Sequence, residues 1–174
     1  ERRGVIHYLR DVFPEALGRL DLRLHQAWKG AGFDPALLIG RLPRLGFGNW
    51  VGGDRDGHHL VTAEVTRETL NELRSSAIQV QRGNLQRLAA RLSLSNRLQK
   101  PPLYLLQAIE SMAEKLGDSG AAAIARNPEE PWRQYLNLLI ARLPDGQCSA
   151  HHYRQPKELL ADLERLRESL IAVH

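Results

Sequence analysis

The sequence predicts a mainly α-helical protein with at most one or two short strands around Phe47–Val51. Apolar residues recur every three or four positions through most of the 174 residues, which is the spacing of one face of an α-helix. Prolines and glycines interrupt this spacing and mark the expected helix ends. Residues 45–62, the glycine stretch, lack the helical spacing and carry five glycines, so we treat them as the feature that the helices hold in place.

The composition is that of an ordinary globular protein, with 43% hydrophobic and 25% charged residues. The formal net charge is +4, and the arginines behind it are spread over the expected helices, which predicts no nucleic-acid partner. No apolar run approaches the roughly 18 residues of a membrane span, so no membrane partner is expected. A single cysteine, Cys148, excludes an internal disulfide and favours a reducing, cytoplasmic location. The chain opens with Glu1 and stops inside a helical pattern, as a piece cut from a longer protein would.

We expect one helical domain over 1–174, beginning with N-terminal helices in residues 1–44. Helical spacing runs over Val5–Trp28. Pro14 lies inside this pattern and predicts a kink or two abutting helices, because proline has no backbone N–H. Further along, Asp34 followed by proline predicts the capped start of a short helix.

Long helices are expected over residues 63–116. Thr62 or Thr66 can cap the first of them, whose apolar stripe continues for about 27 residues. Gly83 weakens this helix by about 1 kcal/mol relative to alanine, and a close helix crossing would explain its presence. The second long helix is predicted over Leu103–Leu116 and ends at a glycine.

Residues 117–131 are small and polar and include two prolines, which predicts a mobile connector. The C-terminal helices are expected over 132–174, with a polar loop between them that contains His151–His152. This histidine pair and His58–His59 are weak zinc candidates, because adjacent histidines rarely bind one metal well.

The charged residues of the glycine stretch indicate an anion-binding role. Asp54, Arg55 and Asp56 alternate in sign, so the carboxylates can hold Arg55 while its guanidinium faces an anion. Trp50, just upstream, offers a large flat apolar wall. A surface turn stiffened by an Asp–Arg pair, with Trp50 in the core, explains the same residues equally well. Both interpretations stay open at this point.

The amino-acid sequence of the glycine stretch also resembles that of a known family. It reads FGNWVGGDRDG and continues into VTAEVT, which resembles FGSWMGGDRDGNP…VT in the phosphoenolpyruvate carboxylase family of bacteria and plants. Tyr8–Asp11 is similar to part of the family's P-x-Y-L-R-E-L helix, and Tyr153–Leu160 to its Y-x-x-P-x-E-L-L-x-D-L helix. The resemblance covers nearly the whole chain, whereas the chain covers a minor part of the family's length. His58–His59 replaces the family's Asn-Pro and Asn49 its usual serine, which suggests a diverged member.

The resemblance implies a helical segment of an α/β barrel, in which parallel strands are buried among many helices and 47–51 is a strand that reaches the active site. It implies a carbon–carbon lyase that joins phosphoenolpyruvate and bicarbonate with magnesium, giving oxaloacetate and phosphate, and that forms a family-type homotetramer. Trp50 would wall the pocket around the substrate methylene, and Asp54, Arg55 and Asp56 would shape its anionic surroundings.

The family's catalytic histidine motif lies upstream of these segments, and its glycine–arginine loop, catalytic lysine and acidic metal ligands lie downstream. We therefore expect no catalytic residue and no magnesium ligand within this chain, and no activity from the chain alone. Two alternatives remain: a non-catalytic carboxylase-like protein that keeps the scaffold for binding or regulation, and a free helical interaction module.

Overall fold

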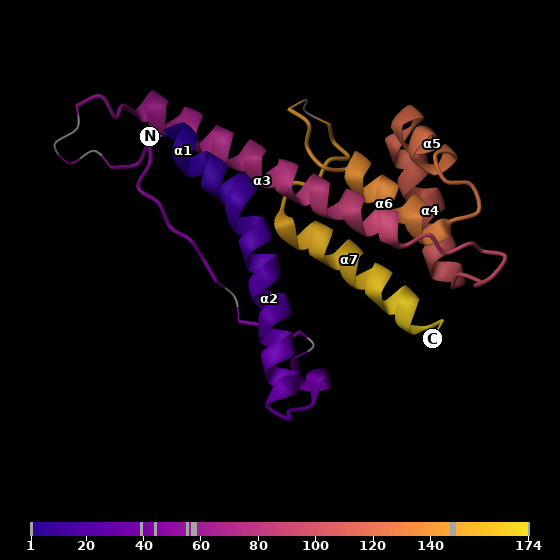
Figure 1. Ribbon diagram of the computed structural model, residues 1–174. Coiled ribbons are helices and arrows are strands. Elements are labelled where there is room, and N and C mark those ends of the chain that lie inside the picture. The colour runs from indigo at the N-terminus through magenta and orange to yellow at the C-terminus, as the bar shows by residue number, and fades with distance from the viewer. Residues whose placement is uncertain are drawn as a thin grey trace. The chain divides into compact units, whose positions relative to one another are not determined.

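The computed structural model describes residues 2–38, 40–43, 45–54, 56, 59–146 and 149–173. More than half of these residues lie in helices, and none of them lies in a strand, which confirms the mainly α prediction. The chain divides into two compact units, Glu1–Val80 and Gln81–His174. Figure 1 labels the helices α1 to α7 along the chain. None of the helices in the described part is long and apolar enough to cross a membrane.

The first unit begins with a nearly continuous helical rod. Helix α1 (Arg2–His7) passes into a π-helical turn (Tyr8–Val12) and then into α2 (Phe13–Gly30). The N–H of Phe13 donates to the carbonyl of Tyr8, five residues earlier, which is the π-helical pattern. The break falls directly before Pro14, so the prediction of abutting helices is confirmed, with a widened turn where they meet.

Capping side chains set the next helix starts as the sequence predicts. The N–H of Ala36 donates to Asp34 Oδ1 at 2.9 Å at the start of the 3₁₀-helix Pro35–Leu38. Thr62 Oγ1 accepts a hydrogen bond from the N–H of Val65 at 3.3 Å, at the start of α3 (Ala63–Arg91). Because these oxygens satisfy N–H groups that lack a helical partner, they fix where each helix begins.

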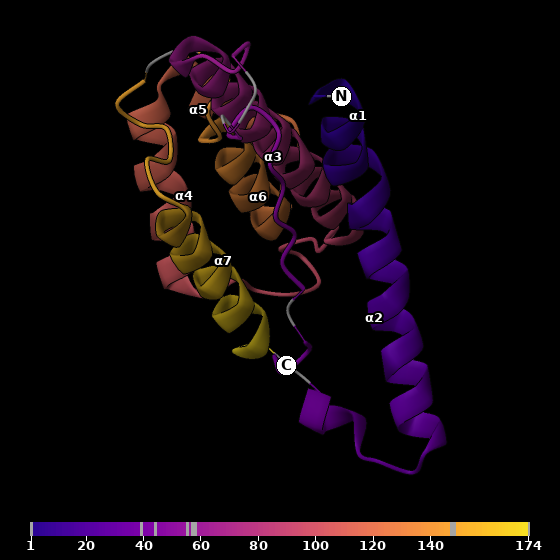
Figure 2. The ribbon, with the colours of Figure 1, turned by 90° about the vertical axis from the view of Figure 1, so that its left-hand side faces the viewer.

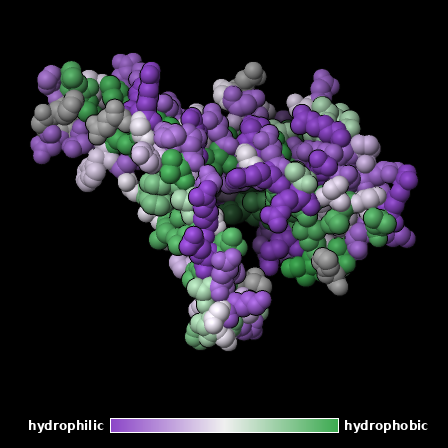
Figure 3. Space-filling view, viewed as in Figure 1, coloured by the Kyte–Doolittle hydropathy of each residue, from purple (hydrophilic) through white to green (hydrophobic). Residues whose placement is uncertain are grey.

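Little of the first unit is buried. Helix α2 buries none of its residues, and hydrophobic side chains of this unit lie open on the surface (Figure 3). Ionic contacts join its elements instead: the Arg2 guanidinium lies 3.0 Å from Glu72 and 3.5 Å from Glu68 on α3. Exposed ion pairs of this kind contribute about 0 to 1 kcal/mol each, so they do not replace a core.

The second unit has a packed core around one central helix. Helix α6 (Pro131–Ala141) packs against α4 (Leu103–Leu116), α5 (Asp118–Ala125) and α7 (Pro156–Ile171) (Figure 2). A helix that is apolar on nearly all sides is suited to such a central place. The fully buried apolar side chains of the unit are Leu105, Trp132, Tyr135, Leu136, Leu138 and Leu139.

The surroundings of two glycines, Gly120 and Gly83, differ from what the sequence predicts. The connector predicted over 117–131 is wrong for α5, because small residues there serve close helix packing. A Cβ on Gly120 would lie under 3.0 Å from the backbone of Ala113 on α4. Gly83, for which we expected a close crossing, has nothing within 4 Å of the place a Cβ would take.

Candidate functional site

The backbone of the glycine stretch forms a tight turn. The N–H groups of Gly53 and Asp54 both donate to the carbonyl of Trp50, at 3.1 and 3.2 Å. Gly52 has φ +70°, an angle that residues with a Cβ rarely adopt. The residues before the turn form no strand, because a strand needs a partner for its backbone groups and no other strand exists among the described residues.

Two contacts anchor this turn within the first unit. A Cβ on Gly52 would lie under 3.0 Å from the side chain of Thr69, so only glycine permits the observed approach to α3. Thr69 is itself buried and donates from Oγ1 to the carbonyl of Val65 at 2.8 Å. On the other side, the Phe47 ring stacks on Phe13 of α2, with centroids 4.3 Å apart. Gly52 therefore places the middle of the turn against α3, and Phe47 places the residues before it against α2.

The acidic residues of the turn are exposed and partly used within it. The N–H of Asp56 donates to Asp54 Oδ1 at 3.1 Å, which is a local side-chain turn. Asn49 makes a similar contact, accepting from the N–H of Val51 at 3.1 Å, so the residue that replaces the family's serine has a structural role. Arg55 and His58 lie outside the described residues, and so does the predicted pairing of Arg55 with the two aspartates.

Trp50 is not a core residue. Its side chain is 81% exposed, whereas Trp132 of the second unit is 0% exposed. The interpretation of Trp50 as part of the chain's own core is therefore wrong. Its ring is available to another surface.

The described residues do not form a metal site. No three of their His, Cys, Asp and Glu side chains come together in a way that could hold an ion. Asp54 and Asp56 share a turn, yet they gather no further ligand from the described part of the chain.

Sequence reasoning missed a buried polar cluster in the second unit. Asp162 on α7 accepts hydrogen bonds from Arg142 at 2.6 Å and from the Tyr153 hydroxyl at 2.8 Å, and the Arg142 guanidinium lies 4.2 Å above the Tyr153 ring. Burial, reinforced by the Asp162 charge, raises the pKa of Tyr135 to about 12 and also raises the pKa of Tyr153. Tyr153 and Asp162 lie nine residues apart, at the Tyr and Asp of the Y-x-x-P-x-E-L-L-x-D-L pattern, whereas Arg142 lies 20 residues before Asp162 and outside that pattern.

Comparison with known proteins places the whole chain in one group. Residues 1–174 match the family model described as phosphoenolpyruvate carboxylase. The phosphoenolpyruvate carboxylase of Methylorubrum extorquens is 32% identical over 169 residues, which cover 93% of this chain and 18% of that protein. The enzyme of the same name from Xanthomonas euvesicatoria pv. vesicatoria is 35% identical over 175 residues, covering 99% of this chain and 19% of that protein.

A third relative of that name, from Gloeobacter violaceus, is 31% identical over 185 residues. It too is matched along only 19% of its length. The chain thus spans less than a fifth of the curated relatives it matches. No solved structure matches it significantly.

Proposed function

Because the chain belongs to the phosphoenolpyruvate carboxylase family, we propose that it is a segment of an enzyme that joins phosphoenolpyruvate and bicarbonate to give oxaloacetate and phosphate. The observation that carries this proposal is the match of all residues, 1–174, to the family model. The chain contributes scaffold helices and the glycine stretch, and the catalytic groups come from other parts of the parent protein.

Within that enzyme, the glycine stretch contributes to the substrate pocket. Trp50 supplies an apolar wall, and Arg55, flanked by Asp54 and Asp56, faces the anionic substrate. Three observations support this role: the turn is held at Gly52, the Trp50 ring is exposed, and Asp54 uses one carboxylate oxygen to shape the turn. A rigid turn with an exposed aromatic ring suits a pocket wall, since it loses little conformational freedom when substrate binds.

Magnesium and the assembly state belong to the parent enzyme. The metal that balances the charge of the phosphate and the developing enolate would be held by ligands outside this chain, because the family's acidic metal ligands lie downstream of the segments that this chain resembles. We also propose a cytoplasmic homotetramer for the parent, as in the family that the chain resembles.

The test is a conservative substitution in the full-length protein. Arg55→Lys keeps the positive charge but loses the two parallel hydrogen bonds of the guanidinium, so kcat/KM for phosphoenolpyruvate should fall by about tenfold or more. The free energy of unfolding should change by less than about 1 kcal/mol. Steady-state kinetics and thermal unfolding of the same preparation measure both. Arg41→Lys, at an exposed position before the stretch, is the matched control and should leave the kinetics unchanged.

Unchanged kinetics in the Arg55→Lys enzyme would leave Arg55 as a structural turn residue. A non-catalytic carboxylase-like parent is the second candidate, and His58–His59 in place of Asn-Pro favours it because the proline's fixed backbone angle is lost. Absence of oxaloacetate formation by the unsubstituted full-length protein, with magnesium and both substrates present, would select this candidate.

A further inference from the structure

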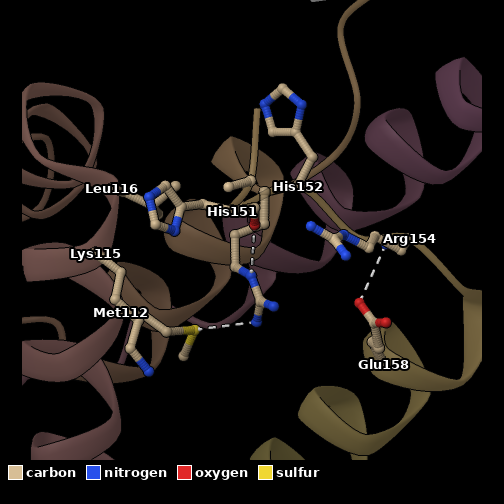
Figure 4. Close-up of a pocket in the computed structure, with 9 residues that line it drawn as sticks. Met112, Lys115, Leu116, His151, His152, Arg154 and Glu158 are labelled. Atoms are coloured by element: carbon tan, nitrogen blue, oxygen red, sulfur yellow. Dashed lines mark hydrogen bonds between the residues drawn. The ribbon is translucent and has the colours of Figure 1, made fainter. Parts of the chain in front are cut away.

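The second unit contains a cavity of about 300 Å³ beside the buried Asp162 cluster. It lies between the end of α4, the loop that follows α6 and the start of α7 (Figure 4). Its volume is at the lower end of the range for small-molecule sites. The cavity is lined by Met112, Lys115, Leu116, Arg142, Ala150, His151, His152, Arg154 and Glu158.

Positive charge predominates in this lining. Lys115, Arg142 and Arg154 are cationic, two more residues are histidines, and Glu158 is the one acidic member. Asp162, from outside the lining, balances Arg142. The Lys115 and Arg154 side chains make no ion pair with any residue that the structure describes, which leaves their charges available to a ligand.

The acidic member of the lining is already engaged. The Glu158 carboxylate accepts a hydrogen bond from the backbone N–H of Arg154 at 3.1 Å, which closes the loop onto the start of α7. Figure 4 shows this contact, with the Arg154 side chain extending from it towards the loop that carries His151. The carboxylate thus shapes the cavity wall and leaves the Arg154 guanidinium free to point at a bound group.

One buried nitrogen of the lining has no partner. The Nδ1 atom of His152 is out of contact with solvent and makes no hydrogen bond to any described residue. A buried polar atom without a partner costs about 1 to 3 kcal/mol. Because solvent does not reach this nitrogen, a ligand in the open cavity does not reach it either, and His152 serves here only as a residue of the lining.

We propose that this cavity binds a small oxyanion of the phosphate type, either free phosphate or the phosphate group of a small metabolite. The cations Lys115 and Arg154 of the lining provide the charged hydrogen-bond donors that phosphate oxygens accept. Met112 and Leu116 give the cavity an apolar side that a short carbon chain can contact. The proposal does not depend on the role of the glycine stretch, because all of its residues belong to the second unit.

Titration of the 174-residue chain with inorganic phosphate, and separately with glycerol 3-phosphate, tests this. The ring-proton resonances of His151 and His152, assigned with His→Gln variants, should shift and saturate with at least one of the two probes. Saturation by both at similar concentrations identifies the phosphate group as the ligand. Saturation by glycerol 3-phosphate at lower concentration adds a contact to the carbon chain.

Two variants locate the site. Lys115→Gln and Arg154→Gln should each weaken binding by roughly tenfold, the effect of losing one charge-assisted hydrogen bond. Arg97→Gln is the matched control: Arg97 is an exposed cation of the same unit, paired with Glu129 at 2.7 Å and outside the cavity, and its loss should leave binding unchanged. Circular dichroism checks that each variant keeps its helices.

Two results would overturn the proposal. One is the failure of both probes to saturate the histidine shifts below roughly 10 mM in the unsubstituted chain. The other is an equal loss of binding in Arg97→Gln, which would show general attraction of anions to a basic surface. The titration of the unsubstituted chain decides the question even if one of the cavity variants fails to fold.

Discussion

Gly52 has a positive φ angle and lies close to Thr69, and no residue with a Cβ can meet both conditions without strain. Its φ of +70° lies in the left-handed region, and Thr69 occupies the space that a Cβ would need. A Cβ on the next residue, Gly53, would lie no closer than 3.8 Å to another atom. Two neighbouring glycines of one motif therefore differ in whether an alanine could replace them. The sequence of the motif alone does not indicate which of the two is constrained.

Gly52→Ala should destabilise the first unit by about 1 to 3 kcal/mol, because it introduces both backbone strain and a clash with α3. Gly53→Ala is the control, and its effect should stay within about 0.5 kcal/mol. Urea unfolding of the two variants, followed by hydrogen exchange at the amides of α3, measures the difference. Equal stability of the two variants would contradict the described approach of Gly52 to Thr69.

Because the pKa of Tyr135 is raised, the free energy of unfolding of the second unit should fall at alkaline pH. Its pKa is about 12 in the folded chain, against an ordinary value of 10.0 that we take for the unfolded chain. Between these values the unfolded state loses the proton while the folded state keeps it, so the free energy of unfolding falls as pH rises. The contribution of Tyr135 is fully present below pH 10 and declines by about 2 to 3 kcal/mol towards pH 12.

Urea unfolding between pH 9 and pH 12 should show this decline in the free energy of unfolding. The range begins about 1 pH unit below the ordinary tyrosine pKa and ends at the raised pKa of Tyr135. Tyr135→Phe should reduce the slope, whereas Tyr104→Phe, at a partly exposed position, should not. An unaltered slope in Tyr135→Phe would remove Tyr135 as its source. Tyr153, whose pKa is also raised, accounts for part of any slope that persists.

Among the elements, helix starts follow from local chemistry and helix packing does not. Asp34 and Thr62 cap the helices that follow them, as expected, because the hydrogen bond of a cap lies within a few residues of sequence. Helix α5 escaped prediction because Gly120 serves a partner on α4, and such a partner is invisible to a local pattern. The missing strand has the same origin, since a strand is defined by a neighbour that the described chain does not provide.

The glycines of α3 and α5 should respond to alanine in opposite directions. Gly120→Ala forces α4 and α5 apart and should destabilise the second unit by about 2 kcal/mol or more. Gly83→Ala meets open space inside a helix and should stabilise by up to about 1 kcal/mol. Thermal unfolding followed by circular dichroism compares them. Stabilisation by both would show that α5 does not pack on α4 as described.

At the scale of the whole molecule, the glycine stretch was predictable in position and in part of its geometry. The tight turn and the exposure of Trp50 agree with the sequence, because glycine density and the family pattern both single out this region. The anchor at Thr69 was not predictable, since it depends on which face of α3 meets the turn. The Asp162 cluster escaped for a similar reason: Tyr153 and Asp162 share one motif, but their contacts with Arg142 and Tyr135 depend on how α6 packs on α7.

The chain by itself should not form oxaloacetate from phosphoenolpyruvate, bicarbonate and magnesium, because the family's catalytic histidine motif and metal ligands lie outside the segments that this chain resembles. A coupled assay that follows oxaloacetate reduction measures this, with a full-length relative as the positive control. Turnover that rises in proportion to the concentration of the chain would contradict the expectation.

The lack of buried residues in α2 has a consequence for biosynthesis. Ribosomes deliver the first unit before the second, and nascent chains fold as they emerge. The half of the chain with the smaller core thus leaves the ribosome first, and the leucines of α2 are uncovered while later segments are still being translated. We expect this helix to be the segment that holding chaperones protect on the ribosome.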